Sequence, residues 1–393
     1  MIAAPLPLPD AAAREHSARV VERVREEIAQ AGGYIAFTRY MEIVLYEPAL
    51  GYYVAGARRF GDSGDFITGP GLSTLYGAAL ARQLQAILQA TGAKRIVELG
   101  AGSGSLAASI LNALARRGVA PDAYSILEVS PDLRERQRAT LATEAPGEAA
   151  RVDWLDRLPE GIDGVVVMNE VLDAIAPRVL ARRGGAWLER GVTWKDGALA
   201  WDERRLADSR LRAIADARFP AEGDYVSEIN PAAEALVATL ARRLRSGALV
   251  IVDYGFPQVE YYHAQRREGT LMGHYRHRSH ADPFLWPGLS DLTAHVDFTA
   301  IARAAEATGM EVAGFATQAS FLLGCGVLDL LAATGAPESL VYLREAAAVQ
   351  KLVSPAEMGE LFKVLLLARG AAEWPSLAIS DMTHRLQKMG SEP

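Results

Sequence analysis

The sequence is poor in cysteine, in long apolar runs and in basic charge, and each shortage excludes a class of protein. The one cysteine among 393 residues, Cys325, excludes internal disulfides and a zinc site built from cysteines. No apolar run approaches the ~20 residues that a membrane-spanning helix requires. The net charge of −7 argues against a nucleic-acid-binding surface, because binding to phosphates needs an excess of basic residues. Residues 1–10 are rich in proline and lack basic residues, unlike a secretory signal, so we expect a cytoplasmic protein.

A glycine-rich segment is the strongest local signal in the chain. The apolar run 95–97 leads into an acidic residue, three glycines follow at alternate positions, and a helical pattern begins at Ser105. This order predicts a strand, a tight turn and a helix start. Glycine suits such a turn because its backbone adopts angles that side chains disfavour and because a ligand can approach it closely. The residues predicted to bind a ligand here are Glu98, Gly100, Ala101, Gly102 and Gly104.

Two classes of cofactor use such a turn. Dinucleotide enzymes bind a pyrophosphate there, usually with glycines spaced G-x-G-x-x-G. The spacing in this chain is G-x-G-x-G, preceded by an acidic residue two positions before the first glycine. That pattern resembles motif I of class I S-adenosylmethionine-dependent methyltransferases, in which the loop holds the methionine part of the cofactor.

Polar residues also accompany the next two apolar strands. Glu128, followed by Val129, ends the second strand, where a carboxylate can accept hydrogen bonds from both ribose hydroxyls of a nucleoside. NAD and S-adenosylmethionine would both satisfy such a site. Asp153 and Trp154 lie in a third, short strand, and we expect them to bind the amino group and the ring of an adenine.

The candidates for catalysis follow the fourth strand and lie near residue 295. Asn169, Glu170 and Asp173 occupy the position that faces the transferring methyl group in methyltransferases acting on nitrogen. The alternative is that Glu170 or Asp173 caps a helix after that strand. His295 and Asp297 are either a histidine oriented by a carboxylate or, for Asp297, the cap of the following helix.

A long polar segment, residues 256–291, carries four of the seven histidines. They are His263, His274, His277 and His280. Arginines are interleaved with them, and these cations oppose metal binding, so we expect a loop that covers the substrate and no metal site.

The order of patterns predicts an α/β fold with inserts. Alternating strands and helices after the glycine segment are typical of a parallel, doubly wound sheet. Gly184-Gly185 and Asp196-Gly197 predict hairpin turns in a β-meander inserted after the fourth strand. We expect a leader and a small helical, aromatic subdomain (1–70), a cofactor-binding α/β core (71–177), a β-meander and helical insert (178–245), the remainder of the core with the covering insert (246–370) and a tail (371–393).

Six motifs between about residues 34 and 330 together resemble one known family. They are Gly51-Tyr52-Tyr53, Gly64-Asp65-Phe66-Ile67-Thr68, the segment 97–104, Asn169-Glu170-Val171-Leu172-Asp173-Ala174, Val252-Asp253-Tyr254-Gly255 and the segment 291–298. As a set they resemble the MidA family, which includes a mitochondrial complex I assembly factor that methylates a protein arginine. Two departures are visible: Gly71 stands where the family usually has an acidic residue, and the family's basic segment is altered in residues 269–277.

The resemblance implies a class I methyltransferase (Rossmann-like) fold, with a mostly parallel seven-stranded sheet and helices on both faces. It implies S-adenosylmethionine as cofactor, with Thr68, Val129 and Asn169 among the residues that bind it, and a protein arginine as acceptor. It also implies a partner such as a respiratory complex I subunit or its bacterial counterpart. Catalysis would consist mostly of holding the acceptor nitrogen about 3 Å from the methyl carbon. The alternatives are an NAD(P)-dependent oxidoreductase and an S-adenosylmethionine-binding assembly factor without catalysis.

Overall fold

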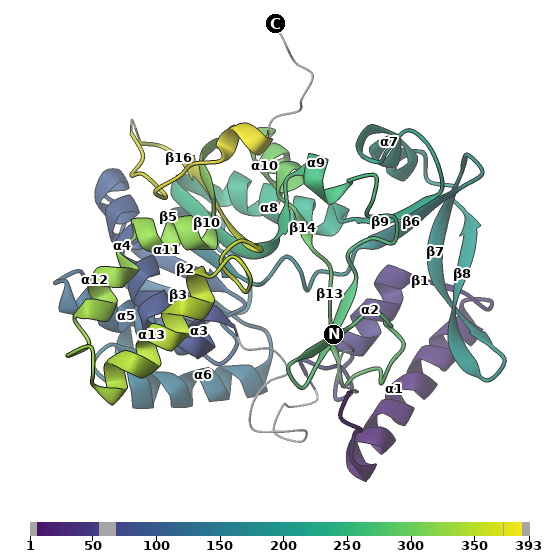
Figure 1. The fold of residues 1–393 in the computed structure, drawn as a ribbon, viewed down its shortest axis with the longest axis horizontal. Helices are drawn as coiled ribbons and strands as arrows, with labels where there is room; N and C mark the ends of the chain where they lie inside the picture. The colour runs from purple at the N-terminus through teal and green to yellow at the C-terminus, as the bar shows by residue number, and fades with distance from the viewer. Residues whose placement is uncertain (1–5, 55–67, 372, 387–393) are drawn as a thin grey trace, which may run out of the picture. The chain divides into compact units, whose positions relative to one another are not determined.

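The computed structural model describes residues 6–54, 68–371 and 373–386. The expectations for the start of the leader, for Gly64-Asp65-Phe66-Ile67 and for the end of the tail lie outside the described residues. The chain forms two compact units (Figure 1). The core unit comprises residues 68–172, 234–257, 296–371 and 373–386, and the second unit comprises residues 6–54, 173–233 and 258–295.

The core unit is built on a mixed, mostly parallel β-sheet. Its strands lie in the order β15-β16-β10-β5-β2-β3-β4, and β14 also pairs with β10. The strands from β10 to β4 are parallel to their neighbours, whereas β16 is antiparallel to both β10 and β15. The bounds are β2 (Arg95–Leu99), β3 (Ala123–Leu127), β4 (Val152–Leu155), β5 (Ile162–Asn169), β10 (Leu244–Phe256), β14 (Val296–Asp297), β15 (Glu311–Thr317) and β16 (Phe362–Arg369). The expected α/β fold is confirmed, and among the described residues β14 adds to the seven strands expected.

Helices cover both faces of this sheet, which explains why its central strands are apolar throughout. Val165, Val166 and Val167 of β5 are completely buried. Helix α4 packs on α5, β5 and β10, while α10 packs on β10, β15 and β16 from the other side (Figure 1). The helices of this unit are α3 (Gly69–Leu72), α4 (Thr74–Thr91), α5 (Ser105–Arg116), α6 (Pro131–Glu144), α8 (Pro231–Arg243), α10 (Phe298–Glu306), α11 (Gln318–Gly324), α12 (Val327–Ala332) and α13 (Leu340–Val353), with 3₁₀ turns at Ala149–Arg151 and Thr383–Leu386.

The order of strands reverses at β2. From β2 the chain runs through β3 to β4 on one side, and then returns to β5 on the other side of β2. In open α/β sheets, ligands bind outside the carboxyl ends of the strands at such a reversal. The glycine segment follows β2 directly and therefore lies at this point.

Two parts of the core unit differ from the sequence expectation. The apolar periodicity of residues 327–348 predicts one helix, but the structure has two, because Gly335 and Pro337 interrupt it and Ser339 starts α13 by accepting from Tyr342 N (3.2 Å). Residues 373–386, expected to be a tail, pack on β15. Asp381 accepts a hydrogen bond from Phe315 N (3.0 Å) and Leu377 is buried.

The second unit contains an antiparallel sheet and a smaller three-stranded one. The larger sheet has the order β1-β7-β6-β9, with β8 paired to β7, and the smaller one has the order β12-β11-β13. The hairpin turns predicted at Gly184-Gly185 and Asp196-Gly197 are present, and all four residues have positive φ. The bounds are β1 (Ile35–Ala36), β6 (Arg178–Arg183), β7 (Ala186–Lys195), β8 (Ala198–Arg205), β9 (Tyr225–Ile229), β11 (Met272–Tyr275), β12 (Arg278–His280), β13 (Asp291–Thr293), α1 (Ala11–Gln30), α2 (Phe37–Tyr46), α7 (Ser209–Arg218) and α9 (Gln258–Tyr261).

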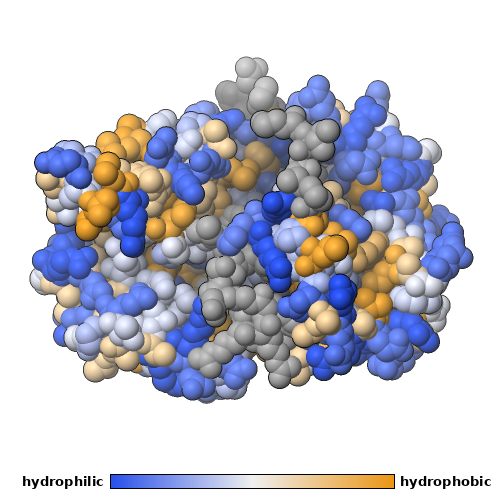
Figure 2. Space-filling view, turned by 60° about the horizontal axis from the view of Figure 1, so that its bottom comes forward, coloured by the Kyte–Doolittle hydropathy of each residue, from blue (hydrophilic) through white to orange (hydrophobic). Residues whose placement is uncertain are grey.

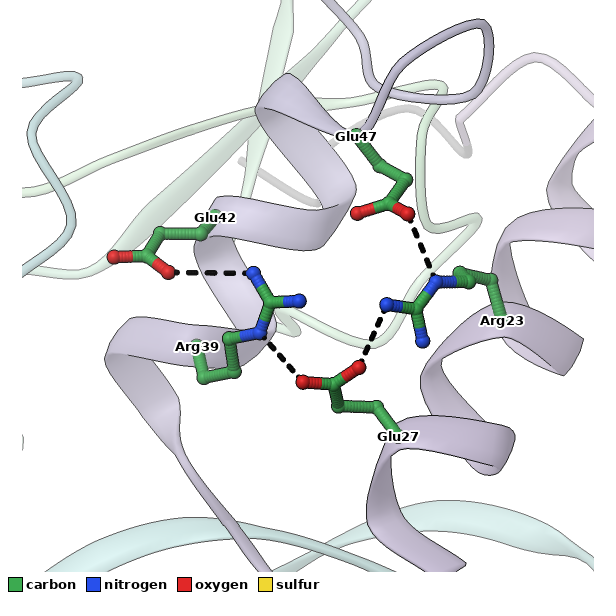
Figure 3. Close-up of polar contacts among 5 residues, drawn as sticks. All are labelled: Arg23, Glu27, Arg39, Glu42 and Glu47. Atoms are coloured by element: carbon green, nitrogen blue, oxygen red, sulfur yellow. Dashed lines mark hydrogen bonds and ion pairs between the residues drawn. The ribbon is translucent and has the colours of Figure 1, made fainter. Parts of the chain in front are cut away.

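Ion pairs connect the two N-terminal helices of the second unit (Figure 3). Helix α1 begins at Ala11, where Asp10 caps it by accepting from Ala13 N (2.8 Å). Glu27 of α1 accepts from Arg23 at 2.6 Å and from Arg39 of α2 at 2.7 Å. Hydrogen bonding to Arg39 is the main cause that lowers the pKa of the Glu27 carboxyl, and burial opposes it.

Because the pKa of Glu27 is lower in the folded state, its stabilisation is present above the unfolded value and is lost as the pH falls through the folded value. We expect Glu27→Gln to destabilise the protein by about 0.5–1 kcal/mol near pH 7. The difference from the wild type should shrink as the pH falls below about 4, since both side chains are then neutral. Thermal unfolding measures this. Glu22→Gln is the matched control, because Glu22 pairs with Arg25 on the exposed side of the same helix. Equal losses in the two variants would contradict the prediction.

In the part of the chain that the structure describes, no helix is both long and apolar enough to span a membrane. On the face drawn in Figure 2, hydrophilic and hydrophobic residues are interspersed.

Candidate functional site

The glycine segment forms the turn between β2 and α5, as the sequence predicts. Gly100, Gly102 and Gly104 all have positive φ, at 67°, 50° and 88°. A Cβ on Gly100 would lie 2.8 Å from Val171 Cγ2, and one on Gly104 would lie 3.1 Å from the Cα of Gln137. A Cβ on Gly102 would meet no described atom within 4 Å. Two of the glycines therefore permit close packing within the protein, and Gly102 leaves open space beside the turn.

The acidic residue of this motif lies beneath the turn. Glu98 is buried in β2 and accepts a hydrogen bond from the Tyr124 hydroxyl at 2.7 Å. Burial raises the pKa of the Glu98 carboxyl to about 7, and the hydrogen bond from Tyr124 opposes that rise. Ala101 in the turn is also buried. The hydrogen bond therefore connects Glu98 of β2 to Tyr124 of the neighbouring strand β3.

Glu128 lies at the carboxyl end of β3, where the sequence places it. Its Oε1 accepts from Ser130 N at 2.9 Å, and its Oε2 accepts from Gln137 Nε2 at 3.2 Å. Val129, also predicted to contact the cofactor, is 77% exposed. A carboxylate oxygen has two lone pairs, so these bonds leave one acceptor position on each oxygen of Glu128.

The two residues predicted to bind adenine have different surroundings. Asp153 lies within β4 and accepts from the Ser125 hydroxyl at 2.8 Å, whereas Asp156 is the carboxylate that follows the strand's carboxyl end. Arg134 connects this end to the end of β3, because it donates to Leu155 O (2.9 Å) and to Glu128 O (2.6 Å). Trp154 donates from its indole to Gln137 Oε1 at 2.8 Å.

Gln137 of α6 connects three parts of this edge, and sequence reasoning missed it. Its Nε2 donates to Gly102 O and to Glu128, both at 3.2 Å, and its Oε1 accepts from Trp154. The side chain is completely buried. The available signal was a glutamine on the apolar side of α6, where Leu141 is its buried neighbour one turn later.

Asn169 ends β5, Glu170 follows it, and their side chains are hydrogen-bonded to each other. The Tyr76 hydroxyl donates to Asn169 Oδ1 at 2.5 Å, and Asn169 Nδ2 donates to Glu170 Oε1 at 2.9 Å. Burial raises the pKa of Tyr76 well above its ordinary value, so Tyr76 stays a donor. Glu170 has a φ of 55°, a conformation that costs a residue other than glycine energy and that concentrates at functional sites.

No helix follows β5 among the described residues, so the suggestion that Glu170 or Asp173 caps one is wrong. The turn is held instead by the buried Asp253, which accepts from Leu172 N at 2.9 Å. Asp173 is the first residue of the segment 173–233 of the second unit, and its carbonyl accepts from Ala294 N at 3.1 Å.

His295 and Asp297 have different hydrogen-bond partners. Asp297 caps α10 by accepting from Ala300 N at 3.1 Å, which confirms the capping alternative for this residue. In the second unit, His295 N donates to Thr270 Oγ1 at 3.1 Å. Thr270 in turn donates to the buried Glu228, which sequence reasoning also missed.

Two predictions remain, namely Thr68 as a cofactor contact and the histidine-rich segment as a covering loop without a metal site. Thr68 precedes α3, and its carbonyl accepts from Gly71 N at 3.0 Å. Burial lowers the pKa of His274 to about 4, so this imidazole is neutral near pH 7. Among the described residues, no group of three histidine, cysteine or acidic side chains is arranged to hold a metal ion.

The arrangement at the carboxyl edge suits a nucleoside cofactor. Gly102 gives a ligand access to the main chain, Glu128 retains acceptor positions for hydroxyl groups, and Trp154 supplies an aromatic ring near them. The Asn169–Glu170 pair supplies a carboxylate at the end of the neighbouring strand.

Comparison with known proteins agrees with this assignment. The model of a family described as "putative S-adenosyl-L-methionine-dependent methyltransferase" matches residues 79–316. A crystal structure from Burkholderia thailandensis, described as a COG1565 superfamily member bound to S-adenosyl-homocysteine, is 47% identical to this chain. It has a TM-score of 0.91 and covers 97% of this chain and 100% of its own.

Two curated relatives match most of the chain. The mouse mitochondrial protein arginine methyltransferase NDUFAF7 is 31% identical over 85% of this chain and 81% of its own length. The Drosophila melanogaster homologue of NDUFAF7 is 29% identical over 92% of this chain and 88% of its own. These matches confirm the methyltransferase prediction and leave the oxidoreductase alternative without support. The chain therefore belongs to this family of S-adenosyl-L-methionine-dependent methyltransferases.

Proposed function

We propose that this methyltransferase acts on an arginine side chain of a protein substrate. Relatives that align with most of the chain are named protein arginine methyltransferases. The structural observation that supports the proposal is the Glu170 carboxylate, which Asn169 holds by a 2.9 Å hydrogen bond at the carboxyl end of β5. A carboxylate is the group that best orients a guanidinium ion, through charge-assisted hydrogen bonds.

We further propose where the cofactor binds. S-adenosyl-L-methionine supplies an electrophilic methyl group when it is bound and leaves as a neutral thioether. Gly102 would admit it to the main chain, and Glu128 would accept hydrogen bonds from its ribose. Trp154 would pack near the adenine, with either Asp153 or Asp156 for the amino group. The other predicted contacts stay predictions: Thr68, Glu98, Ala101, Val129 and Asn169.

Glu128→Ala should weaken S-adenosyl-L-methionine and S-adenosyl-L-homocysteine binding by about tenfold or more, because a hydrogen bond to a charged group contributes about 1.5–3 kcal/mol. Isothermal titration calorimetry with both ligands measures this. Glu135→Ala is the control, since Glu135 lies exposed on the same helix as Gln137. Wild-type affinity in Glu128→Ala would remove Glu128 from the ribose role.

The positive charge of the acceptor has to be drawn away from the reacting nitrogen, because a guanidinium is protonated at neutral pH and is a poor nucleophile. Glu170 would accept hydrogen bonds from the guanidinium and draw its positive charge toward the nitrogens that do not react. The reacting nitrogen would then lie in line with the methyl group and would gain the bond to carbon that the sulfur gives up. The nitrogen would afterwards release one proton to solvent, and holding the acceptor in line would be the main contribution of the protein.

The test is transfer of labelled methyl groups from S-adenosyl-L-methionine to proteins in an extract. We expect acid hydrolysis of the labelled protein to release methylated arginine. Glu128→Ala provides the matched sample with weakened cofactor binding, and it should transfer less label when S-adenosyl-L-methionine is limiting. Label on lysine, glutamine or a carboxylate would contradict the arginine proposal.

Three finer expectations stay predictions. Asp173, His295 and Asp297 are proposed to assist with the acceptor, and single alanine variants in the same transfer assay test each of them. A respiratory complex I subunit or its bacterial counterpart is the proposed partner, and identification of the labelled protein tests it. The cytoplasmic location is tested by cell fractionation.

A further inference from the structure

Gln137 belongs to none of the sequence motifs, yet its side chain makes three hydrogen bonds at the carboxyl edge of the core sheet. Its two amide hydrogens go to Gly102 O and Glu128 Oε2, and its amide oxygen accepts from Trp154 Nε1. One side chain thus reaches the glycine turn, the predicted ribose carboxylate and the predicted adenine residue. Helix α6 also packs directly on the turn, since a Cβ on Gly104 would lie 3.1 Å from the Cα of Gln137.

Trp154 determines which way the amide of Gln137 points. An indole N–H is a donor only, so the 2.8 Å contact must be made by the amide oxygen. The amide nitrogen is then directed at Glu128 and Gly102. The Gln137 side chain itself is completely buried, whereas Gly102 and Glu128 are not, so its amide holds from the interior two groups that border the surface.

The acceptor positions of Glu128 explain why a donor is needed at Gln137. Ser130 N occupies one position on Oε1, and Gln137 occupies one on Oε2. The plane of the carboxylate is thereby fixed, with one lone pair left on each oxygen. Two free lone pairs on two oxygens match the two adjacent hydroxyls of a ribose.

We propose that Gln137 is a positioning residue for the cofactor, which orients the Glu128 carboxylate toward the ribose and connects it to the glycine turn and Trp154. This inference rests on the proposed ribose role of Glu128. Gln137 itself acts through Glu128 and is not a catalytic residue. The cations near the site come from α6: Arg134 donates to the Glu128 carbonyl, and the Arg138 guanidinium lies over the Trp154 ring.

The first test replaces the amide by an apolar side chain of similar length. Gln137→Met removes both donors, so the dissociation constant for S-adenosyl-L-homocysteine should rise by about tenfold or more at every pH. Gln318→Met is the matched control. Gln318 is an equally buried glutamine of the core unit, and it donates to Leu352 O at 2.9 Å. That variant should lose stability and keep the affinity of the wild type. Unchanged affinity in Gln137→Met would overturn the proposal.

The second test gives a readout that a purely structural role would not change. In Gln137→Glu the new carboxyl faces Glu128, and two carboxylates so close share a proton at low pH. The shared proton restores a donor to Glu128 near pH 5.5, whereas near pH 8 both groups are charged and repel each other. Relative to the wild type at each pH, we expect affinity to fall about tenfold at the higher pH and about threefold or less at the lower one. An equal loss at both pH values would overturn the proposal.

A double variant separates failure of this inference from failure of the ribose assignment. If Gln137 acts through Glu128, Glu128→Ala combined with Gln137→Met should bind about as weakly as Glu128→Ala alone. Losses that multiply would overturn the positioning role and leave the ribose role intact. Wild-type affinity in Glu128→Ala alone would instead contradict the ribose role.

Discussion

Gly102→Val is expected to abolish binding of S-adenosyl-L-methionine. A Cβ at Gly102 would meet no described protein atom within 4 Å, so the added methyl groups would occupy the open space beside the turn. That is the space in which we propose the cofactor lies against the main chain, and a ligand cannot share it with a branched side chain. We expect calorimetry to show affinity reduced by at least about a hundredfold, since the steric overlap affects several contacts at once.

Backbone strain must be separated from this steric effect. Gly102 has a φ of 50°, and a valine in that conformation costs about 1–2 kcal/mol wherever it occurs. Gly92, which ends α4, has a φ of 66° and equally open surroundings, so Gly92→Val is a matched control. Both variants should unfold at a lower temperature, and only Gly102→Val should lose the cofactor. If Gly102→Val binds as tightly as the wild type, the cofactor lies elsewhere.

The core of the fold was predictable because its signals are local. An apolar strand followed by alternate glycines and a helix start can be read in one short segment, and the structure has β2, the turn and α5 there. The break between α12 and α13 was harder to predict, because the apolar periodicity continues through it while Gly335 and Pro337 interrupt the backbone. The antiparallel direction of β16 could not be read either, since a buried strand has the same composition in both directions.

The candidate site was predictable where a side chain follows a strand, and unpredictable where a contact depends on packing. Glu128 and Glu170 end strands, and their positions agree with the expectation. Gln137 reaches the same edge from the side of α6, and no spacing rule connects it to Gly102 or Trp154. Glu98 belongs to the glycine motif by sequence. Side chains alternate between the two faces of β2, and that of Glu98 is hydrogen-bonded to Tyr124 of the neighbouring strand.

Replacing Glu170 should separate methyl transfer from cofactor binding. We propose that this carboxylate holds the acceptor nitrogen in line, and misplacement by about 1 Å can cost about a hundredfold in rate. Glu170→Ala and Glu170→Gln should therefore reduce methyl transfer by about that factor, while the dissociation constant of S-adenosyl-L-homocysteine changes by less than about threefold. Glutamine keeps the acceptor for Asn169, so a loss in that variant reports the missing charge.

Glu170→Gly gives the sharpest form of this test. At this position the backbone conformation favours glycine, whereas the proposed function requires the carboxylate of glutamate. A φ of 55° strains glutamate and suits glycine, so removal of the side chain should leave the melting temperature equal to or above that of the wild type. Glu170 N still donates to Val252 O at 2.8 Å in such a variant, which keeps the turn in place. A protein that is no less stable, binds the cofactor and transfers no methyl group would mean that the strain at Glu170 is retained for catalysis. A lower melting temperature with transfer intact would instead assign Glu170 to the structure of the turn.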